Sequence, residues 1–200
     1  MQLFAPAYEA IRTVSPDITI VTAGLAPTDD SGFSVNDRAF LNQMYAGGLA
    51  DFADVVIGVH PYGWGNAADV RCCDVAPDLG WDEVGQFYFI NTLEDYHSIT
   101  VNNNHAVDLW ATEFGWASWE GIGGSPVEEW MGYNTLTEQS DNTIRAFQIG
   151  QALDYMGPMF LWNLNFANAD NVAQNNEVIA YSMFIVDSAR PVFNTLAEGQ

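Results

Sequence analysis

Short apolar segments alternate along the chain with longer segments whose apolar residues recur at helical spacing. Four of the short segments are almost wholly apolar, which is typical of strands buried on both faces. They cover residues 18–23, 55–59, 109–112 and 159–163. The pattern therefore predicts four buried strands.

The segments between these strands predict helices. The first begins near Phe4 and is expected to end at residues 15–17, which read Ser-Pro-Asp. Apolar positions at helical spacing predict further helices over 36–52, 87–99 and 144–153. Residues 157–158, Gly-Pro, are expected to end the last of these, and Pro191 to open a final short helix.

Strands that alternate with helices indicate parallel βα units. We therefore expect an α/β fold with about four such units, in one domain over residues 1–200. Long loops are expected after strands, over 63–85 and 117–137, and a polar loop over 167–177. Because sites in parallel α/β folds form at the carboxyl ends of strands, candidate residues there should share one face.

Composition narrows the possible partners. The 200 residues include 26 acidic and 5 basic side chains, all five of them arginine, for a formal net charge of −21. A protein that binds a phosphate backbone or an anionic membrane surface needs clustered basic residues, so both partners are disfavoured. No apolar run reaches the roughly 18 residues of a membrane span, and no signal peptide is expected after Met1. A neutral, hydroxyl-rich or a cationic ligand suits this acidic, aromatic-rich chain.

The cysteines are adjacent and carry little information. Cys72 and Cys73 are either a vicinal disulfide or two free thiols. A metal site would need further Cys or His residues close in sequence, and His60 and His97 lie far from the pair. No metal and no organic cofactor is expected.

Glu113 is the strongest candidate for a catalytic residue. It follows a buried strand and is flanked by Trp110, Phe114 and Trp116, where loss of solvation and neighbouring groups can set the pKa of a carboxylate. A carboxylate that caps a loop or pairs with an arginine would show the same pattern.

His60 and Tyr62 follow the preceding strand, two residues apart and thus on one face. Either side chain could hydrogen-bond Glu113 and favour its ionised form, although a packing role fits them equally. Trp162 ends the fourth strand, where an indole can stack on a sugar ring or fill the core. Asn163 and Asn165 add polar groups beside it, and strand alternation allows only one to face inward.

These residues together resemble a known group of enzymes. The segment 109–116 (LWATEFGW), with His60-Pro-Tyr62 before it and residues 160–163 (FLWN) after it, is similar to the second half of clan A glycoside hydrolases. The similarity covers essentially the whole chain and is greatest to the cellulase-like and β-xylosidase-like branches, families 5 and 39. It implies that the chain is half of a (β/α)8 barrel, strands five to eight.

The resemblance also implies roles. Glu113 corresponds to the catalytic nucleophile, Tyr62 to the aromatic residue that touches it, with His60 beside it, and Trp162 to the tryptophan that floors the sugar subsite. Trp64, Trp116 and Asn165 would complete a carbohydrate-binding site. The expected activity is hydrolysis of β-linked oligo- or polysaccharides by a retaining mechanism. Relatives that act on polysaccharides are often exported.

The chain departs from this family in one respect. The acid/base glutamate of the family ends strand four, and the sequence has no counterpart of strands one to four, whereas a full barrel needs about 250 residues. Carboxylates in two loops could substitute for it, and each has little support by itself. They are Asp29, Asp30, Glu120, Glu128 and Glu129.

Half a barrel leaves strand edges and an inner face uncovered, which favours association. We expect either a homodimer that completes the barrel or completion by residues outside this chain. Two other functions remain open: a non-catalytic carbohydrate-binding half-barrel and an inactive fragment.

Overall fold

The computed structural model describes residues 1–73 and 83–199, and these form a mixed α/β fold. Four strands make one parallel sheet in the order β1–β2–β3–β4, so that neighbours in sequence are neighbours in the sheet. The strands are Ile20–Val21 (β1), Val55–Val59 (β2), Leu109–Phe114 (β3) and Met156–Leu161 (β4). The alternating pattern predicts this parallel sheet, which is curled into half of a barrel, the shape that the resemblance implies.

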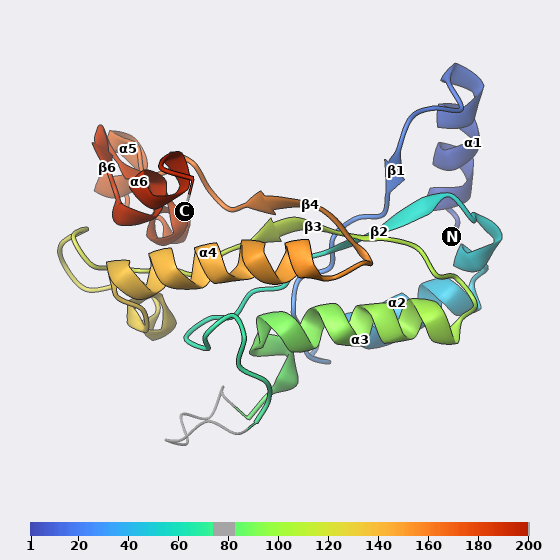
Figure 1. The fold of residues 1–200 in the computed structure, drawn as a ribbon, viewed down its shortest axis with the longest axis horizontal. Helices are drawn as coiled ribbons and strands as arrows, with labels where there is room; N and C mark the ends of the chain where they lie inside the picture. The colour runs from blue at the N-terminus through green and yellow to red at the C-terminus, as the bar shows by residue number, and fades with distance from the viewer. Residues whose placement is uncertain (74–82, 200) are drawn as a thin grey trace.

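Helices alternate with the strands along the chain, beginning with a helix before the first strand (Figure 1). They are α1 (Phe4–Val14), α2 (Asp37–Ala46), α3 (Phe89–Asn102), α4 (Leu136–Ala152), α5 (Ala169–Ala173) and α6 (Pro191–Ala197). Short 3-10 segments are η1 (Leu49–Asp51), η2 (Gly85–Phe87), η3 (Glu129–Gly132) and η4 (Glu177–Tyr181). An antiparallel hairpin, β5 (Phe184–Ile185) and β6 (Ser188–Ala189), precedes α6.

The main core lies between the sheet and the helices α2, α3 and α4, which run along one face of it (Figure 1). Alternate residues of β2, such as Ile57 and Val59, are fully buried there, against Leu41 of α2, Leu93 of α3 and Ala146 of α4. α2 and α3 bury apolar residues at helical spacing, as predicted, whereas the buried residues of α4 are mostly polar or small, such as Gln139, Asn142 and Ala146. Burial of this kind dominates the stability of the unit.

The opposite face of the sheet is much less covered. Trp110 of β3 contacts Phe160 of β4 there, with ring centroids 6.3 Å apart. Phe160 is 51% exposed, although it lies within a strand. β1 and β4 each have one strand neighbour and form the two edges of the sheet.

Several predicted boundaries are confirmed and others are wrong. β2 covers the predicted residues 55–59, whereas β4 starts earlier than predicted, and residues 157–158 lie inside it rather than ending a helix. α4 begins at Leu136, because Thr135 and Glu138 form a reciprocal capping box at its start. A short helix, α5, occupies the predicted polar loop 167–177. Of the predicted loop 63–85, residues 74–82 lie outside the described residues.

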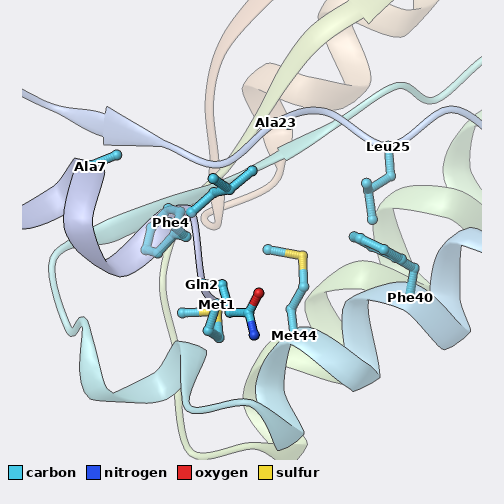
Figure 2. A pocket seen from close by; sticks show the side chains of 9 residues that line it. Met1, Gln2, Phe4, Ala7, Ala23, Leu25, Phe40 and Met44 are labelled. Atoms are coloured by element: carbon cyan, nitrogen blue, oxygen red, sulfur yellow. The ribbon is translucent and has the colours of Figure 1, made fainter.

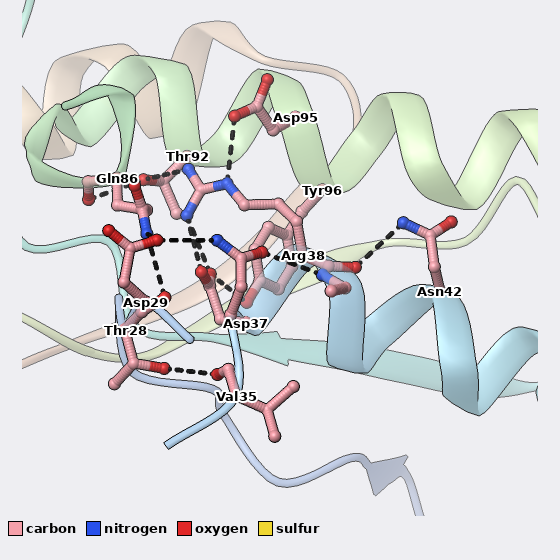
Figure 3. A network of polar contacts seen from close by, with 12 residues as sticks. Thr28, Asp29, Val35, Asp37, Arg38, Asn42, Gln86, Thr92, Asp95 and Tyr96 are labelled. Carbon is pink, nitrogen blue, oxygen red and sulfur yellow. Dashed lines mark hydrogen bonds and ion pairs between the residues drawn. The ribbon is translucent and has the colours of Figure 1, made fainter. Parts of the chain in front are cut away.

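A buried carboxylate joins α2 to α3 (Figure 3). The Asp37 side chain accepts hydrogen bonds from the Tyr96 hydroxyl at 2.8 Å and from Arg38 Nη1 at 2.8 and 3.1 Å. Arg38 also donates to Thr92 and to the more exposed Asp95. Burial and the Asp37 carboxylate raise the pKa of Tyr96. The network therefore neutralises a charge that would be costly to bury alone.

Candidate active site

Glu113 owes its position to an irregularity in β3. Leu109, Ala111 and Phe114 are all fully buried against the helices, which strict alternation would not allow. The pairing of β3 with β4 shifts register between Ala111 and Phe114. This shift turns Phe114 into the core and leaves Glu113 on the less covered side, as the second-to-last residue of the strand rather than just past it.

Glu113 lies beside both residues that were considered as its hydrogen-bond partners, Tyr62 and His60. The Tyr62 hydroxyl donates a hydrogen bond of 2.8 Å to Glu113 Oε2. His60 Nδ1 lies 3.6 Å from the same oxygen. The Glu113 side chain is 32% exposed and that of His60 17%, so the carboxylate faces solvent and the imidazole lies behind it. These contacts follow from the pairing of β2 with β3, which places their carboxyl ends side by side.

The protonation states of the two partners follow from their surroundings. Burial and the Glu113 carboxylate raise the pKa of Tyr62, so its hydroxyl stays a donor at neutral pH. Burial lowers the pKa of His60, an effect that the Glu113 carboxylate opposes. Because the lowering effect is the larger one, the imidazole is neutral at pH 7.

His60 is held on its other side by backbone. A Cβ atom added to Gly24 would overlap the His60 ring and the Thr112 hydroxyl. The Thr112 hydroxyl is buried and has no hydrogen-bond partner among the described residues. The absence of a side chain at residue 24 is therefore what allows the chain after β1 to pass close to the imidazole.

Glu113 lines a cavity of about 310 Å³ with aromatic walls. Trp64 and Trp162 line it as well, so the structure brings these two predicted tryptophans to the carboxylate. The Trp64 ring stacks on Phe87 at 3.9 Å and on Trp130 at 5.5 Å between centroids. Such flat rings can stack on the apolar face of a sugar.

Trp116 does not belong to this site, and its predicted role in substrate binding is corrected. It is 1% exposed and packs in the core against Phe89, with ring centroids 5.7 Å apart. Its indole Nε1 donates to the Asn66 carbonyl at 2.8 Å, and its ring lies against Gly63. The indole is buried because Gly63 has no side chain to keep it out.

Asn165 is also outside the cavity lining. It is exposed, beyond the end of β4. Asn163 is the buried member of the pair, and its amide is used internally: it donates to the Val178 carbonyl and accepts from the Ser182 hydroxyl and from the Phe166 backbone N–H. It therefore shapes the loop after β4, and neither asparagine faces Glu113 as expected.

Three aromatic or acidic residues that line the cavity were not predicted from the sequence. Trp130 comes from η3, and Glu177 and Tyr181 from η4. The Tyr62 and Tyr181 rings meet edge to face at 5.5 Å. Burial, followed by the Glu177 and Glu113 carboxylates, raises the pKa of Tyr181. η3 lies in the predicted loop 117–137, whereas the predicted loop 167–177 includes only the first residue of η4. The aromatic residues Trp130 and Tyr181 were the feature that could have drawn attention to these segments.

The carboxylates proposed as substitute acids do not line the cavity. Glu120 accepts a hydrogen bond from the Leu136 backbone N–H, and Asp29 and Asp30 bind Asn36 in their own loop. Glu128 and Glu129 are exposed at the start of η3. Glu177 is thus the second carboxylate of the cavity among the described residues.

A larger groove lies elsewhere and is apolar (Figure 2). Its volume is about 680 Å³, and it lies between α1, α2 and the chain after β1, with Phe4, Leu25 and Met44 in its walls. The side chains that line it include no carboxylate, imidazole or thiol. It offers an apolar surface beside the β1 edge and no group for acid–base chemistry.

Cys72 and Cys73 are placed as a vicinal disulfide. Among the described residues, His, Cys, Asp and Glu side chains do not form a group of three that could hold a metal ion. Over the same residues, none of the helices is both long and apolar enough to cross a bilayer. Comparisons of the chain with protein-family models, curated proteins and solved structures give no match.

Proposed function

We propose that this chain is the half-barrel of a retaining β-glycoside hydrolase, with Glu113 as its nucleophile. The observation that supports this most is the 2.8 Å hydrogen bond from Tyr62 to Glu113 at the rim of an aromatic cavity. Trp64 and Trp162 in the same walls fit a sugar ring. The resemblance of segments 60–62, 109–116 and 160–163 to clan A glycoside hydrolases points to the same function.

The first step follows from the contacts of the carboxylate. Both neighbouring groups, the Tyr62 hydroxyl and His60 Nδ1, lie at Oε2. Oε1 would attack the anomeric carbon, the bond from that carbon to the leaving oxygen would break, and the electron pair would go to the leaving oxygen. Water would then hydrolyse the glycosyl ester and restore the carboxylate.

The leaving oxygen of a natural substrate needs a proton, and retaining enzymes place a second carboxyl group about 5–5.5 Å from the nucleophile. None of the five carboxylates first considered for this role lines the cavity. Glu177 is the one other carboxylate among the described residues of the lining, and it is exposed rather than buried as a raised-pKa acid would be. This observation favours the second candidate function, a carbohydrate-binding half-barrel that stacks sugars without cleaving them.

A substrate with an activated leaving group separates the two functions, because a dinitrophenolate departs without a proton. The chain is incubated with 2,4-dinitrophenyl 2-deoxy-2-fluoro-β-glucoside and the matching xyloside, and intact mass and peptide mapping follow. We expect one sugar per chain, attached to Glu113. Glu113→Gln should remain unlabelled and Glu128→Gln should label normally. An unlabelled protein that still binds cello-oligosaccharides would refute the nucleophile and support the binding function.

We also propose that two copies associate to complete the sheet. A twofold axis along the barrel would place β4 of each copy beside β1 of the other, parallel to it, and would cover the Trp110–Phe160 face. The apolar groove in Figure 2 adjoins that β1 edge. The charge of −21 on each copy opposes this contact at low salt. Light scattering should therefore detect a dimer whose population rises with salt, and a monomer at all salt concentrations would refute the proposal.

A further inference from the structure

The charge inside the cavity of Glu113 is of one sign. Among the described residues that line it, the charged side chains are Glu113 and Glu177. The nearest titratable base is His60, which lies behind Glu113 and is neutral at pH 7, since burial lowers its pKa. An occupant of this cavity therefore meets two negative charges and no positive one.

The arginines of the protein do not change this balance. Four of them form ion pairs with carboxylates, and the fifth, Arg190, is 4% exposed and donates to backbone carbonyls and to Gln139. The four pairs are Arg12–Asp54, Arg38–Asp37, Arg71–Glu94 and Arg145–Asp69. Because the sequence contains no lysine and each arginine has partners of its own, the described residues offer no free cationic side chain to counter the two cavity carboxylates.

The cavity walls are also suited to a cation. Trp130, Trp162 and Tyr181 all line the cavity, and Tyr181 is 6.0 Å from Trp130 between ring centroids. Trp64 lines it as well, but its ring is stacked on Trp130 at 5.5 Å and on Phe87 at 3.9 Å. Tyr181 lines the same cavity as Glu113 and Glu177. The negative face of an aromatic ring attracts ammonium groups, most strongly for tryptophan.

We infer that the sugar bound in this cavity carries a protonated amine, and that Glu177, among the aromatic rings of the lining, selects a β-linked glucosamine unit over a neutral or uronic acid unit. This inference rests on the proposed function and specifies its substrate class. Glu113 stays free to act on the anomeric carbon, and Glu177 supplies the carboxylate that the amine meets. Uronic acids, which carry a carboxylate of their own, would be repelled.

Binding of four β-1,4-linked tetramers tests the inference, measured by calorimetry on the full chain. The tetramers are those of glucosamine, N-acetylglucosamine, glucose and glucuronate, which share one ring skeleton and differ in charge. We expect the glucosamine tetramer to bind about tenfold or more tightly than the glucose tetramer, in line with a charge-assisted contact. The glucuronate tetramer should bind weakest, and added salt should reduce the preference.

Two variants assign the preference to a residue. Glu177→Gln should remove most of the preference for glucosamine over glucose, whereas Glu128→Gln, which changes net charge equally outside the cavity, should leave the binding of both tetramers unchanged. Equal binding of glucosamine and glucose, or a preference that survives Glu177→Gln, would overturn the inference. If Glu113 is labelled while the preference is missing, the inference alone fails. If no tetramer binds and no label attaches, the proposed function fails with it.

Discussion

Replacing Asp37 with asparagine tests the polar network between α2 and α3 (Figure 3). The carboxylate is 2% exposed and accepts from two partners, Arg38 and Tyr96. Asparagine has nearly the same size but only one acceptor oxygen, so its NH2 group must face one of the two donors. The variant Asp37→Asn therefore keeps the packing and removes the charge and one hydrogen bond.

The magnitude follows from the burial of the two partners. Removing one member of a buried ion pair costs about 3–5 kcal/mol. Arg38 keeps its contacts with Thr92 and with the half-exposed Asp95, which reduces the loss. We therefore expect Asp37→Asn to lower the free energy of unfolding by about 2–4 kcal/mol, a large part of the stability of a domain.

Asp95→Asn is the matched control, because Asp95 contacts the same arginine from a side chain that is 49% exposed. Its loss should stay below about 1 kcal/mol. Urea denaturation followed by tryptophan fluorescence measures both values, provided that the slope with urea is unchanged. If Asp37→Asn lowers the free energy of unfolding no more than Asp95→Asn does, the buried network does not stabilise the fold.

Three further predictions follow from the site and the core. Tyr62→Phe should slow labelling of Glu113 by about 10- to 100-fold without unfolding the protein, because it removes a hydrogen bond to a charged group; labelling at the parent rate would contradict this. Trp116→Ala should lower the free energy of unfolding by about 3–5 kcal/mol in urea denaturation, since the indole is buried; a loss under about 1 kcal/mol would place it at the surface. Burial raises the pKa of Tyr45 from 10.0 to about 12. The unfolded chain releases this proton near pH 10 and the folded chain only near pH 12. The stabilisation that the protonated Tyr45 hydroxyl contributes is therefore complete below about pH 10 and is lost as pH rises to about 12. Tyr45→Phe should flatten stability curves measured by circular dichroism in this range, and an unchanged slope would refute the shift.

Sequence patterns predicted the strands better than their ends. β2 is apolar throughout and bounded by polar residues, and its limits are confirmed. β4 contains Pro158, which suggested a helix end. Because β4 is an edge strand, it tolerates a residue without a backbone N–H. The capping box of Thr135 and Glu138 was visible in the sequence and would have placed the start of α4 correctly.

The candidate site was predictable where it depends on strand ends. Glu113 and Tyr62 meet because β2 and β3 are neighbours in a parallel sheet. Trp116 is buried by a contact with Gly63, more than fifty positions away, which local periodicity does not encode. Glu177 reaches the cavity through the fold of the segment after β4, so its place depends on tertiary structure alone.

Gly24 has a consequence for how variation in this protein should be interpreted. It carries no functional group, yet any side chain there would displace the His60 imidazole or the Thr112 hydroxyl. In a saturation mutagenesis screen for sugar binding or turnover, residue 24 should tolerate substitution as poorly as Glu113 itself. A screen that scores only loss of function would then classify residue 24 as catalytic, although its requirement is steric. The structure distinguishes this steric requirement from the chemical requirement at Glu113.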